Sequence, residues 1–352
     1  MKVELKINGR TVGPGHPVYI VAELSANHGQ DFDQAVRIVR AMKAAGADAV
    51  KVQTYTPDTL TIQSDVEHFR IGGGTLWDGR TLYDLYDEAY MPWEWQPKLK
   101  LLANELGLEF FSTPFDRTAV DFLERMDVPA YKIASFELVD LPLIRAVGRT
   151  GKPLIMSTGM ASEEEISEAV AIAREAGCTE LALLKCTSAY PALPEEMNLR
   201  TIPDLAAKFR VVPGLSDHTL GTTVSVVAVS LGACIVEKHF TLARTMGGPD
   251  AAFSLEPDEF KAMVDDIRMA EKALGRINYT VSPHESKSRM FRRSLFVVKD
   301  VKTGEPFTEE NVRSIRPGYG LHTRHLSEVL GRKAAQDIKR GTPLEWEHVA
   351  RA

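Results

Sequence analysis

Short apolar runs recur along the first 240 residues of the chain, and nearly every run ends in a polar or charged residue. Strands that are buried on both faces of a parallel sheet have this continuous apolar pattern. Between the runs, apolar residues recur at spacings of three and four, which is typical of helices. The pattern therefore predicts strands that alternate with helices and run parallel to one another. The eight predicted strands cover residues 18–23, 47–53, 108–113, 130–135, 153–158, 181–186, 211–218 and 234–239.

The number of these strand–helix units favours an α/β fold of the closed (β/α)8 type, the TIM barrel, over an open sheet. A doubly wound open sheet is the alternative, but no Gly-x-Gly-x-x-Gly pattern follows the first predicted strand. One predicted helix begins with a capping box, in which Ser162 precedes Glu165 by three residues, and it stops at Gly177. The clearest helical segments cover residues 31–46, 118–126, 141–150, 162–177 and 257–275.

Two segments depart from the strand–helix rhythm. Residues 54–93 are far longer than the usual βα loop of about 4–6 residues, and their aromatic side chains suggest a lid or a specificity wall at the barrel mouth. From residue 291 the chain changes to short apolar runs separated by KTGE and KRGT turns, which predicts a small β-rich domain. We therefore predict a barrel domain at 1–280, a linker at 281–290 and a second domain at 291–352.

The composition is that of a globular protein, with 44% hydrophobic and 26% charged residues. No apolar run approaches the ~18–20 residues that cross a membrane, and no signal-peptide pattern precedes the first strand. The cysteines also lack the paired spacing of a disulfide framework. We therefore expect a cytoplasmic location. Residues 281–352 hold 14 Lys and Arg against 9 Asp and Glu. These charges are scattered and lack interleaved aromatics, so we expect no nucleic-acid binding and favour contact with an anionic substrate or an acidic barrel.

Two histidines stand at the ends of neighbouring predicted strands. Because the carboxyl ends of barrel strands meet at one mouth, His218 and His239 should project close together. Two imidazoles with a few oxygens suit a divalent transition metal that keeps positions open for water and substrate. Two hydrogen-bonded structural histidines are the alternative.

Lysines near the strand ends suggest a second half of the site. An unpaired buried ammonium group is costly, so Lys51 and Lys132 need a role. One use is a Schiff base, as in class I aldolases, and the other is a clamp for phosphate or carboxylate. Lys185 and Lys238 can instead pair with barrel glutamates. Small hydroxyl donors at other strand ends favour the clamp: Ser135, Ser157 and Ser216.

Glu23 and Asp250 are candidate carboxylates for proton transfer or for orienting a metal-bound water. For Asp250 the alternative is a turn residue that follows Pro249. The combination of metal, anion clamp and carboxylates indicates carbon–carbon bond chemistry on a phosphorylated or carboxylated small molecule. These residues alone do not choose among an aldolase, a synthase and an isomerase.

Motifs along the whole chain resemble the sialic acid synthase (NeuB-like) family. The C-terminal RRSLF, KTGE and RPGYG segments resemble the antifreeze-like (SAF) domain of that family. This resemblance implies a transferase that condenses phosphoenolpyruvate with an open-chain amino sugar to give a nonulosonic acid and phosphate. The motifs are AELSANHGQDF (22–32), VKVQTY (50–55), KIAS (132–135), STGM (157–160), KCTSAYP (185–191), GLSDHT (214–219), EKHF (237–240) and GGPDAAFS (247–254).

The resemblance also implies roles for individual residues. His218 and His239 would bind a divalent metal, Mn2+ in preference to Mg2+ or Co2+. Arg316 would reach the site from the partner subunit of a domain-swapped homodimer. The phosphoenolpyruvate ligands would be Lys51, Lys132, Ser135, Ser157 and Ser216. The metal and sugar side would be lined by Glu23, Gln53, Glu137, Tyr190 and Asp250.

Two features bear on the sugar. Ser188 replaces the Asn that the N-acetylneuraminate branch carries, and the LYDLYDEAYMPWEW segment resembles the pseudaminic acid synthase branch, whose substrate is 2,4-diacetamido-2,4,6-trideoxy-L-altrose. An N-acetylneuraminate or legionaminic acid synthase is the alternative within the family, and a non-catalytic carbohydrate-binding scaffold is the alternative outside it. The segment's aromatics would form a wall for this more apolar sugar or would pack under the lid: Tyr83, Tyr86, Tyr90 and Trp93.

Overall fold

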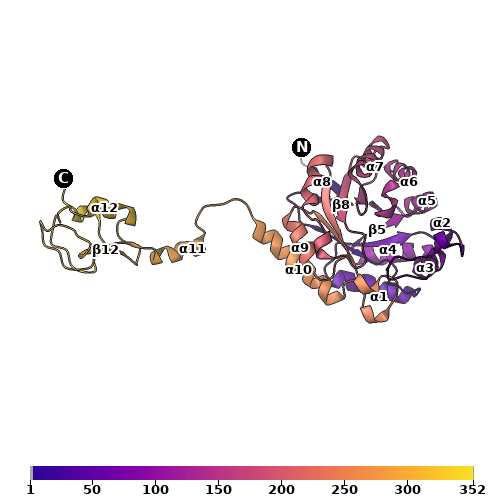
Figure 1. Cartoon of the computed structure of the whole chain (residues 1–352), viewed down its shortest axis with the longest axis horizontal. Coiled ribbons are helices and arrows are strands. Elements are labelled where there is room, and N and C mark those ends of the chain that lie inside the picture. The colour runs from indigo at the N-terminus through magenta and orange to yellow at the C-terminus, as the bar shows by residue number, and fades with distance from the viewer. Residues whose placement is uncertain (1–2, 352) are drawn as a thin grey trace. The chain divides into compact units, whose positions relative to one another are not determined.

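The computed structural model describes residues 3–351, and within them eight parallel strands close into a barrel (Figure 1). The predicted TIM barrel is therefore confirmed, with one strand in each of the eight predicted segments. The last strand pairs with the first, with His239 opposite Glu23, and this pairing closes the sheet. The strands are β3 (Tyr19–Glu23), β4 (Ala49–Thr54), β5 (Glu109–Pro114), β6 (Tyr131–Ile133), β7 (Leu154–Ser157), β8 (Leu181–Cys186), β9 (Val212–Asp217) and β10 (Ile235–His239).

Amphipathic helices surround the barrel and pack their apolar faces on it (Figure 1). Helix α7 begins with the predicted capping box between Ser162 and Glu165. Helix α1 is capped by Asp31, whose side chain accepts two backbone N–H bonds. The surrounding helices are α1 (Phe32–Ala44), α4 (Gln96–Glu105), α5 (Arg117–Arg125), α6 (Leu141–Gly148), α7 (Glu163–Glu175), α8 (Thr201–Phe209), α9 (Thr223–Ser230) and α10 (Pro257–Leu274).

A hairpin of β1 (Leu5–Ile7) and β2 (Arg10–Val12) covers the amino-terminal end of the barrel. Its buried apolar side chains join the same core cluster as Tyr19 at the start of β3. Polar contacts from this hairpin reach residues that precede or begin other strands, including Asp48 and Glu109. The hairpin closes this end of the barrel, so a substrate has to enter at the carboxyl ends of the strands.

The long connection between β4 and β5 contains two helices, α2 (Pro57–Leu60) and α3 (Leu82–Ala89). Between them, an isolated bridge joins Arg70 to Thr81 and closes a loop of the intervening residues. The connection is therefore an ordered excursion, which we call the lid (residues 55–93). Short 3-10 turns lie at η1 (Glu67–Phe69), η2 (Trp93–Trp95), η3 (Phe136–Val139), η4 (Pro194–Glu196), η5 (Arg244–Met246) and η6 (Ala251–Phe253).

The chain divides into two compact units, Met1–Gly275 and Arg276–Ala352. The second unit is small and β-rich, and it has its own apolar core around Leu295, Phe307 and Leu344. A short capped helix, α11 (Pro283–Ser288), lies within the segment that we predicted to be a linker without periodic structure. The remaining elements are η7 (Arg289–Phe291), β11 (Ser294–Val297), β12 (Val312–Ile315), η8 (Thr323–His325), α12 (Leu326–Val329) and η9 (Trp346–His348).

None of the helices in residues 3–351 combines the length and the apolar character that crossing a membrane would need.

Candidate active site

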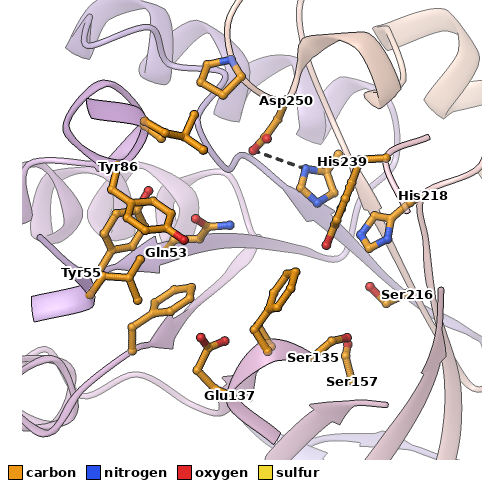
Figure 2. A pocket seen from close by; sticks show the side chains of 18 of the residues that line it. Gln53, Tyr55, Tyr86, Ser135, Glu137, Ser157, Ser216, His218, His239 and Asp250 are labelled. Atoms are coloured by element: carbon orange, nitrogen blue, oxygen red, sulfur yellow. Dashed lines mark ion pairs between the residues drawn. The ribbon is translucent and has the colours of Figure 1, made fainter. Parts of the chain in front are cut away.

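A cavity of about 530 Å3 lies at the carboxyl ends of the barrel strands, where Figure 2 shows side chains from many strands converging. Its size suits a small-molecule site. One side is polar and is built from strand ends, whereas the lid and the loops after the strands supply apolar side chains. The polar lining consists of Lys51, Gln53, Lys132, Ser135, Glu137, Ser157, Cys186, Ser216, His218, Glu237, His239 and Asp250.

Of the residues assigned to catalysis, to substrate binding or to the metal from the sequence, all but three line this cavity. Glu23 is fully buried and pairs with Lys51 of the lining. Ser188 is not part of the lining, and its hydroxyl lies 4.0 Å from the Cys186 thiol. Arg316 belongs to the second compact unit, where its side chain is exposed.

The two histidines lie next to each other, with their ring centroids 5.3 Å apart (Figure 2). The Nδ1 atom of His218 donates a hydrogen bond to the Thr187 carbonyl at 3.0 Å. In the neutral ring, the Nε2 atom therefore carries the free lone pair. The Nδ1 atom of His239 is buried, has no hydrogen-bond partner among the described residues, and lies 4.0 Å from an Asp250 oxygen. A buried nitrogen without a partner beside a carboxylate is what a metal ligand set requires.

A buried ion pair lies directly behind the histidines. Lys238 and Asp217 are fully buried and their charged atoms are 2.8 Å apart. Each residue precedes one of the histidines in the sequence, and the two are paired in the β9–β10 register. Lys238 also donates to the Thr219 carbonyl at 2.5 Å. The pair therefore joins the two strand ends from which His218 and His239 project. Lys238 is in an ion pair as expected, but its partner is an aspartate and not a barrel glutamate, and Lys185 instead donates to the Cys186 carbonyl at 2.7 Å.

No three His, Cys, Asp or Glu side chains within residues 3–351 already converge as a metal-binding cluster. A metal between the two histidines would therefore take its remaining ligands from Asp250, water or substrate. This arrangement leaves positions open, as catalytic metal sites do. The donor set of neutral imidazole and carboxylate oxygen fits a divalent ion of the Mn2+ class.

Lys51 stands between two buried carboxylates. Its Nζ atom lies 2.5 Å from Glu23 and 3.5 Å from Glu237. Burial alone would lower the pKa of Lys51, but the two carboxylates outweigh burial and raise it. Burial raises the pKa of Glu23 to about 7, against the opposing effect of Lys51. Lys51 is therefore a fixed ammonium group whose charge is already matched within the barrel.

Lys132 has weaker charge compensation. Its Nζ atom donates to Ser157 Oγ at 2.6 Å and to the Ile133 carbonyl at 2.8 Å. Burial lowers the pKa of Lys132. Ser135 lies close by, where its Oγ atom accepts a hydrogen bond from the Gly159 amide at 3.1 Å. A lysine surrounded by hydroxyl donors is suited to binding an anion.

Glu137 and Asp250 are two further carboxyl groups of the lining, Asp250 beside His239 and Glu137 toward Ser135 and Ser157 (Figure 2). Burial raises the pKa of Glu137 to about 7, and its Oε2 atom has no hydrogen-bond partner among the described residues. Asp250 accepts hydrogen bonds from the Ser25 hydroxyl and from the Ala26 amide. Asp250 is therefore held in the cavity lining and does more than shape a turn.

The sequence analysis missed several lining residues. Glu237 was considered only as a partner for lysine, although a period of two places it on the same inward face of β10 as His239. Cys186 was not among the candidate site residues, yet it lines the cavity and its thiol lies 3.8 Å from His218. Burial raises the pKa of Cys186, but His218, Ser135 and Lys132 together outweigh burial and lower it to about 7. The missed apolar lining includes Tyr55, Trp77, Phe115, Phe136 and Phe253.

The predicted aromatic wall is correct for only one of its four members. Tyr86 lines the cavity together with Tyr55 (Figure 2). Trp93 packs on Phe122 at 4.9 Å between ring centroids, which is the alternative of packing under the lid. Tyr83 and Tyr90 are absent from the lining, and Tyr83 instead contacts Asp58.

Comparison with known proteins agrees with this geometry. Residues 38–279 match the NeuB family and residues 292–350 match the SAF domain. The chain belongs to the NeuB family. It is 49% identical to the pseudaminic acid synthase of Campylobacter jejuni over 93% of this chain and 95% of that protein, and 45% identical to the pseudaminic acid synthase of Helicobacter pylori over 96% and 99%. The predicted family and SAF domain are confirmed.

A solved structure supports the fold of this NeuB-family chain. The spore coat polysaccharide biosynthesis protein SpsE of Bacillus subtilis superposes with a TM-score of 0.68 at 34% identity, covering 99% of this chain and all of that one. Enzymes of the family are generally metal-dependent, which agrees with the paired histidines.

The raised pKa of Glu137 predicts a pH-dependent cost to stability. A carboxyl with a raised folded-state pKa favours folding below its unfolded pKa, and this contribution is lost as the pH rises through about 7. Glu137→Gln should therefore stabilise the protein by on the order of 2 kcal/mol at pH 8 and have little effect at pH 4. Urea unfolding at both pH values measures the free energy of unfolding, with Glu168→Gln, at an exposed position, as the control. An equal change in this free energy at both pH values would contradict the prediction.

Proposed function

We propose that this NeuB-family chain is a pseudaminic acid synthase, which condenses phosphoenolpyruvate with 2,4-diacetamido-2,4,6-trideoxy-L-altrose and releases phosphate. The observation that carries the proposal is a single cavity that joins three features: a histidine pair, an anion-binding lysine with hydroxyls, and a broad apolar wall. The similarity to two pseudaminic acid synthases selects this sugar over those of the legionaminic and N-acetylneuraminic acid synthases. Phosphoenolpyruvate is a cytoplasmic metabolite, so we also propose a cytoplasmic location.

The polar floor of the cavity is the proposed phosphoenolpyruvate site. Lys132 on β6 and Ser157 on β7 form one part of it, and Lys51 lies on β4, which only β5 separates from β6. Ser135 and Ser216 place further hydroxyls at neighbouring strand ends. These groups would hold the phosphate and carboxylate so that the enol carbon faces the histidines.

We assign His218, His239 and Asp250 as the side that holds the metal, with Mn2+ preferred and Mg2+ or Co2+ as alternatives. A bound divalent ion supplies Lewis-acid polarisation of the sugar aldehyde. Gln53, Glu137 and Tyr190 would hold the sugar hydroxyl and amide groups on this side. Glu137 with a pKa of about 7 can donate a hydrogen bond in its neutral form and accept one in its charged form.

The reaction forms one carbon–carbon bond and, at C2, replaces the carbon–oxygen bond to phosphate by one to water, while the aldehyde oxygen gains a proton and the added water loses one. The enol carbon attacks the aldehyde carbon, and positive charge develops at C2 of the enolpyruvate unit. Water adds at C2, and the resulting tetrahedral carbon expels phosphate. The buried carboxylates of Glu23 and Glu237 lie where they can stabilise that positive charge.

The charges in the cavity indicate that one chain does not complete the site. Lys51 is paired with Glu23 and Glu237, and Asp250 and Glu137 add two more carboxyl groups to the lining, so acidic groups outnumber the two lysines. A substrate that carries both phosphate and carboxylate needs additional cations in such a low-dielectric site. The metal supplies one cation, and we propose that Arg316 of the partner subunit supplies another.

Exposed apolar side chains around the mouth support a dimer. They lie on loops that follow successive strands, and such a patch is unusual on a surface that stays in water. The connecting residues Ile277 and Tyr279 are also exposed, at 91% and 97%. We propose that a second copy of this chain covers these surfaces in a domain-swapped homodimer. The exposed side chains at the mouth are Phe136, Val139, Met160, Leu193, Leu220 and Met246.

The sugar assignment predicts a clear substrate preference. The kcat/KM for 2,4-diacetamido-2,4,6-trideoxy-L-altrose should exceed that for N-acetylmannosamine by at least about a hundredfold, because the apolar wall favours the deoxy, twice-acetylated sugar. Phosphate release from phosphoenolpyruvate measures both rates. Preference for N-acetylmannosamine would overturn the assignment, and the absence of phosphate release with any nonulosonate precursor would favour the carbohydrate-binding scaffold.

The metal assignment predicts the effect of removing either imidazole. His218→Ala or His239→Ala should lower turnover by more than about a hundredfold, since losing even a partner of a metal ligand costs about 10- to 100-fold. Calorimetric titration with Mn2+ should show that binding is lost, while circular dichroism shows the fold retained. His16→Ala, an exposed histidine, is the control. Wild-type Mn2+ affinity in either cavity variant would refute the assignment.

The dimer proposal predicts complementation between two inactive variants. Arg316→Ala should be inactive because it lacks the side chain that reaches the partner's site. His218→Ala should be inactive because its own barrel lacks a metal ligand. Equal mixing and refolding should restore ~a quarter of wild-type activity, because each mixed dimer contains one intact site. Arg313→Ala, another exposed arginine of this unit, should stay active alone. No rescue on mixing would indicate that Arg316 does not act across subunits.

A further inference from the structure

We propose that Trp77 of the lid is a specificity-determining residue for the amino sugar. It acts through a hydrogen bond that holds the lid to the loop carrying Asp250. This inference rests on the proposed function and concerns the sugar side of the same cavity. Trp77 is half-buried and lines the cavity, although the sequence analysis did not single it out.

The indole nitrogen of Trp77 connects two segments that are distant in the sequence. Its Nε1–H donates a hydrogen bond to the Pro249 carbonyl at 3.0 Å. The next residue, Asp250, is held to Ser25 and lies 4.0 Å from His239. Gln53 also donates to Ser25, at 3.0 Å. One hydrogen bond therefore couples the position of the lid to the carboxylate beside the proposed metal site.

The loop that carries Trp77 is built to present it. Asp78 accepts hydrogen bonds from the Gly74 amide at 2.9 Å and from the Thr75 amide at 2.8 Å. At the base of the loop, the Ile71 and Arg80 backbones bond at 2.8 Å. These contacts fix the backbone on both sides of the indole, so the side chain keeps its direction toward the cavity without needing a ligand to order it.

The Trp77 ring belongs to an aromatic cluster that reaches the histidines. Its centroid lies 5.7 Å from that of Tyr190, and the Tyr190 ring lies 4.4 Å from that of His218. Phe253 contacts Tyr190 and His239 in the same cluster. A sugar whose aldehyde faces the histidines would extend its other end along these rings. The indole face therefore suits the apolar methyl groups of the sugar away from C1, which N-acetylmannosamine has fewer of.

The chain offers a matched control for this proposal. Trp93 is a half-buried lid tryptophan whose Nε1–H also donates to a backbone carbonyl, that of Tyr55, at 3.0 Å. Trp93 does not line the cavity and packs on Phe122 instead. The two tryptophans thus share chemistry, burial and element, and they differ in access to substrate.

The test compares Trp77→Phe, Trp77→Ala and Trp93→Phe in the full-length dimer, with phosphate release as the assay. Trp77→Phe removes the donor and keeps a ring, and it should raise the KM for the diacetamido sugar by about fivefold. Trp77→Ala should raise it by about 30-fold or more. The KM for phosphoenolpyruvate should change by less than about twofold in both, because that substrate binds on the lysine side. Trp93→Phe should leave both KM values close to wild type.

A second measurement separates sugar recognition from a general effect on folding. The ratio of kcat/KM for the diacetamido sugar to that for N-acetylmannosamine should fall by about tenfold in Trp77→Ala and stay constant in Trp93→Phe. Equal losses for both sugars, or a matching rise in the KM for phosphoenolpyruvate, would overturn the proposal. If the wild type prefers another sugar, the proposed function fails. Trp77 is then tested with that sugar by the same KM comparison, in which an unchanged KM in Trp77→Ala would overturn its role.

Discussion

A buried cluster of opposite charges at the seam of the barrel is the constraint on which the site depends. Lys51 bridges Glu23 and Glu237, and these residues come from the neighbouring strands β4, β3 and β10. Removing each charge from water costs several kcal/mol, which only mutual pairing offsets. Because β10 and β3 are the last and first strands of the barrel, the same pairing that neutralises the site also joins the two ends of the sheet.

This cluster makes the cavity electrostatically incomplete within one chain. The charge of Lys51 is already balanced by its two carboxylates, so Lys132 is the lysine that can bind an incoming anion. Under the proposed function, phosphoenolpyruvate binding would then depend on further cations, which would be the proposed metal beside the histidines and the proposed Arg316 of the partner subunit. Coupling of this kind would keep the enolpyruvate unit from being activated before the aldehyde, the metal and the second subunit are in place.

The sequence predicted the strand ends well and the lid poorly, for one physical reason. His239 ends β10 and His218 directly follows β9, so both continue a repeating geometry in which a buried apolar run and a period of two determine where a side chain points. The same rule would have identified Glu237. In the lid, Trp77 and Trp93 have similar local sequences, and only tertiary contacts decide that one reaches the cavity while the other packs on Phe122. Arg316 was assigned by resemblance alone, since contacts between subunits leave no local pattern.

Sugar specificity in this family is best understood as a property of loops laid over a common floor. The lysines, serines and histidines lie in strands or within two residues of a strand end, whereas Trp77, Tyr190 and Phe253 come from three different connections, where the Tyr190 ring contacts the other two. Ser188 illustrates how tightly these loops pack, because an added Cβ at Gly159 would meet its hydroxyl at 2.2 Å. A longer Asn side chain at 188 would have to displace this packing. Under the proposed function, substitutions in the loops would change the sugar while the chemistry at the strand ends is preserved.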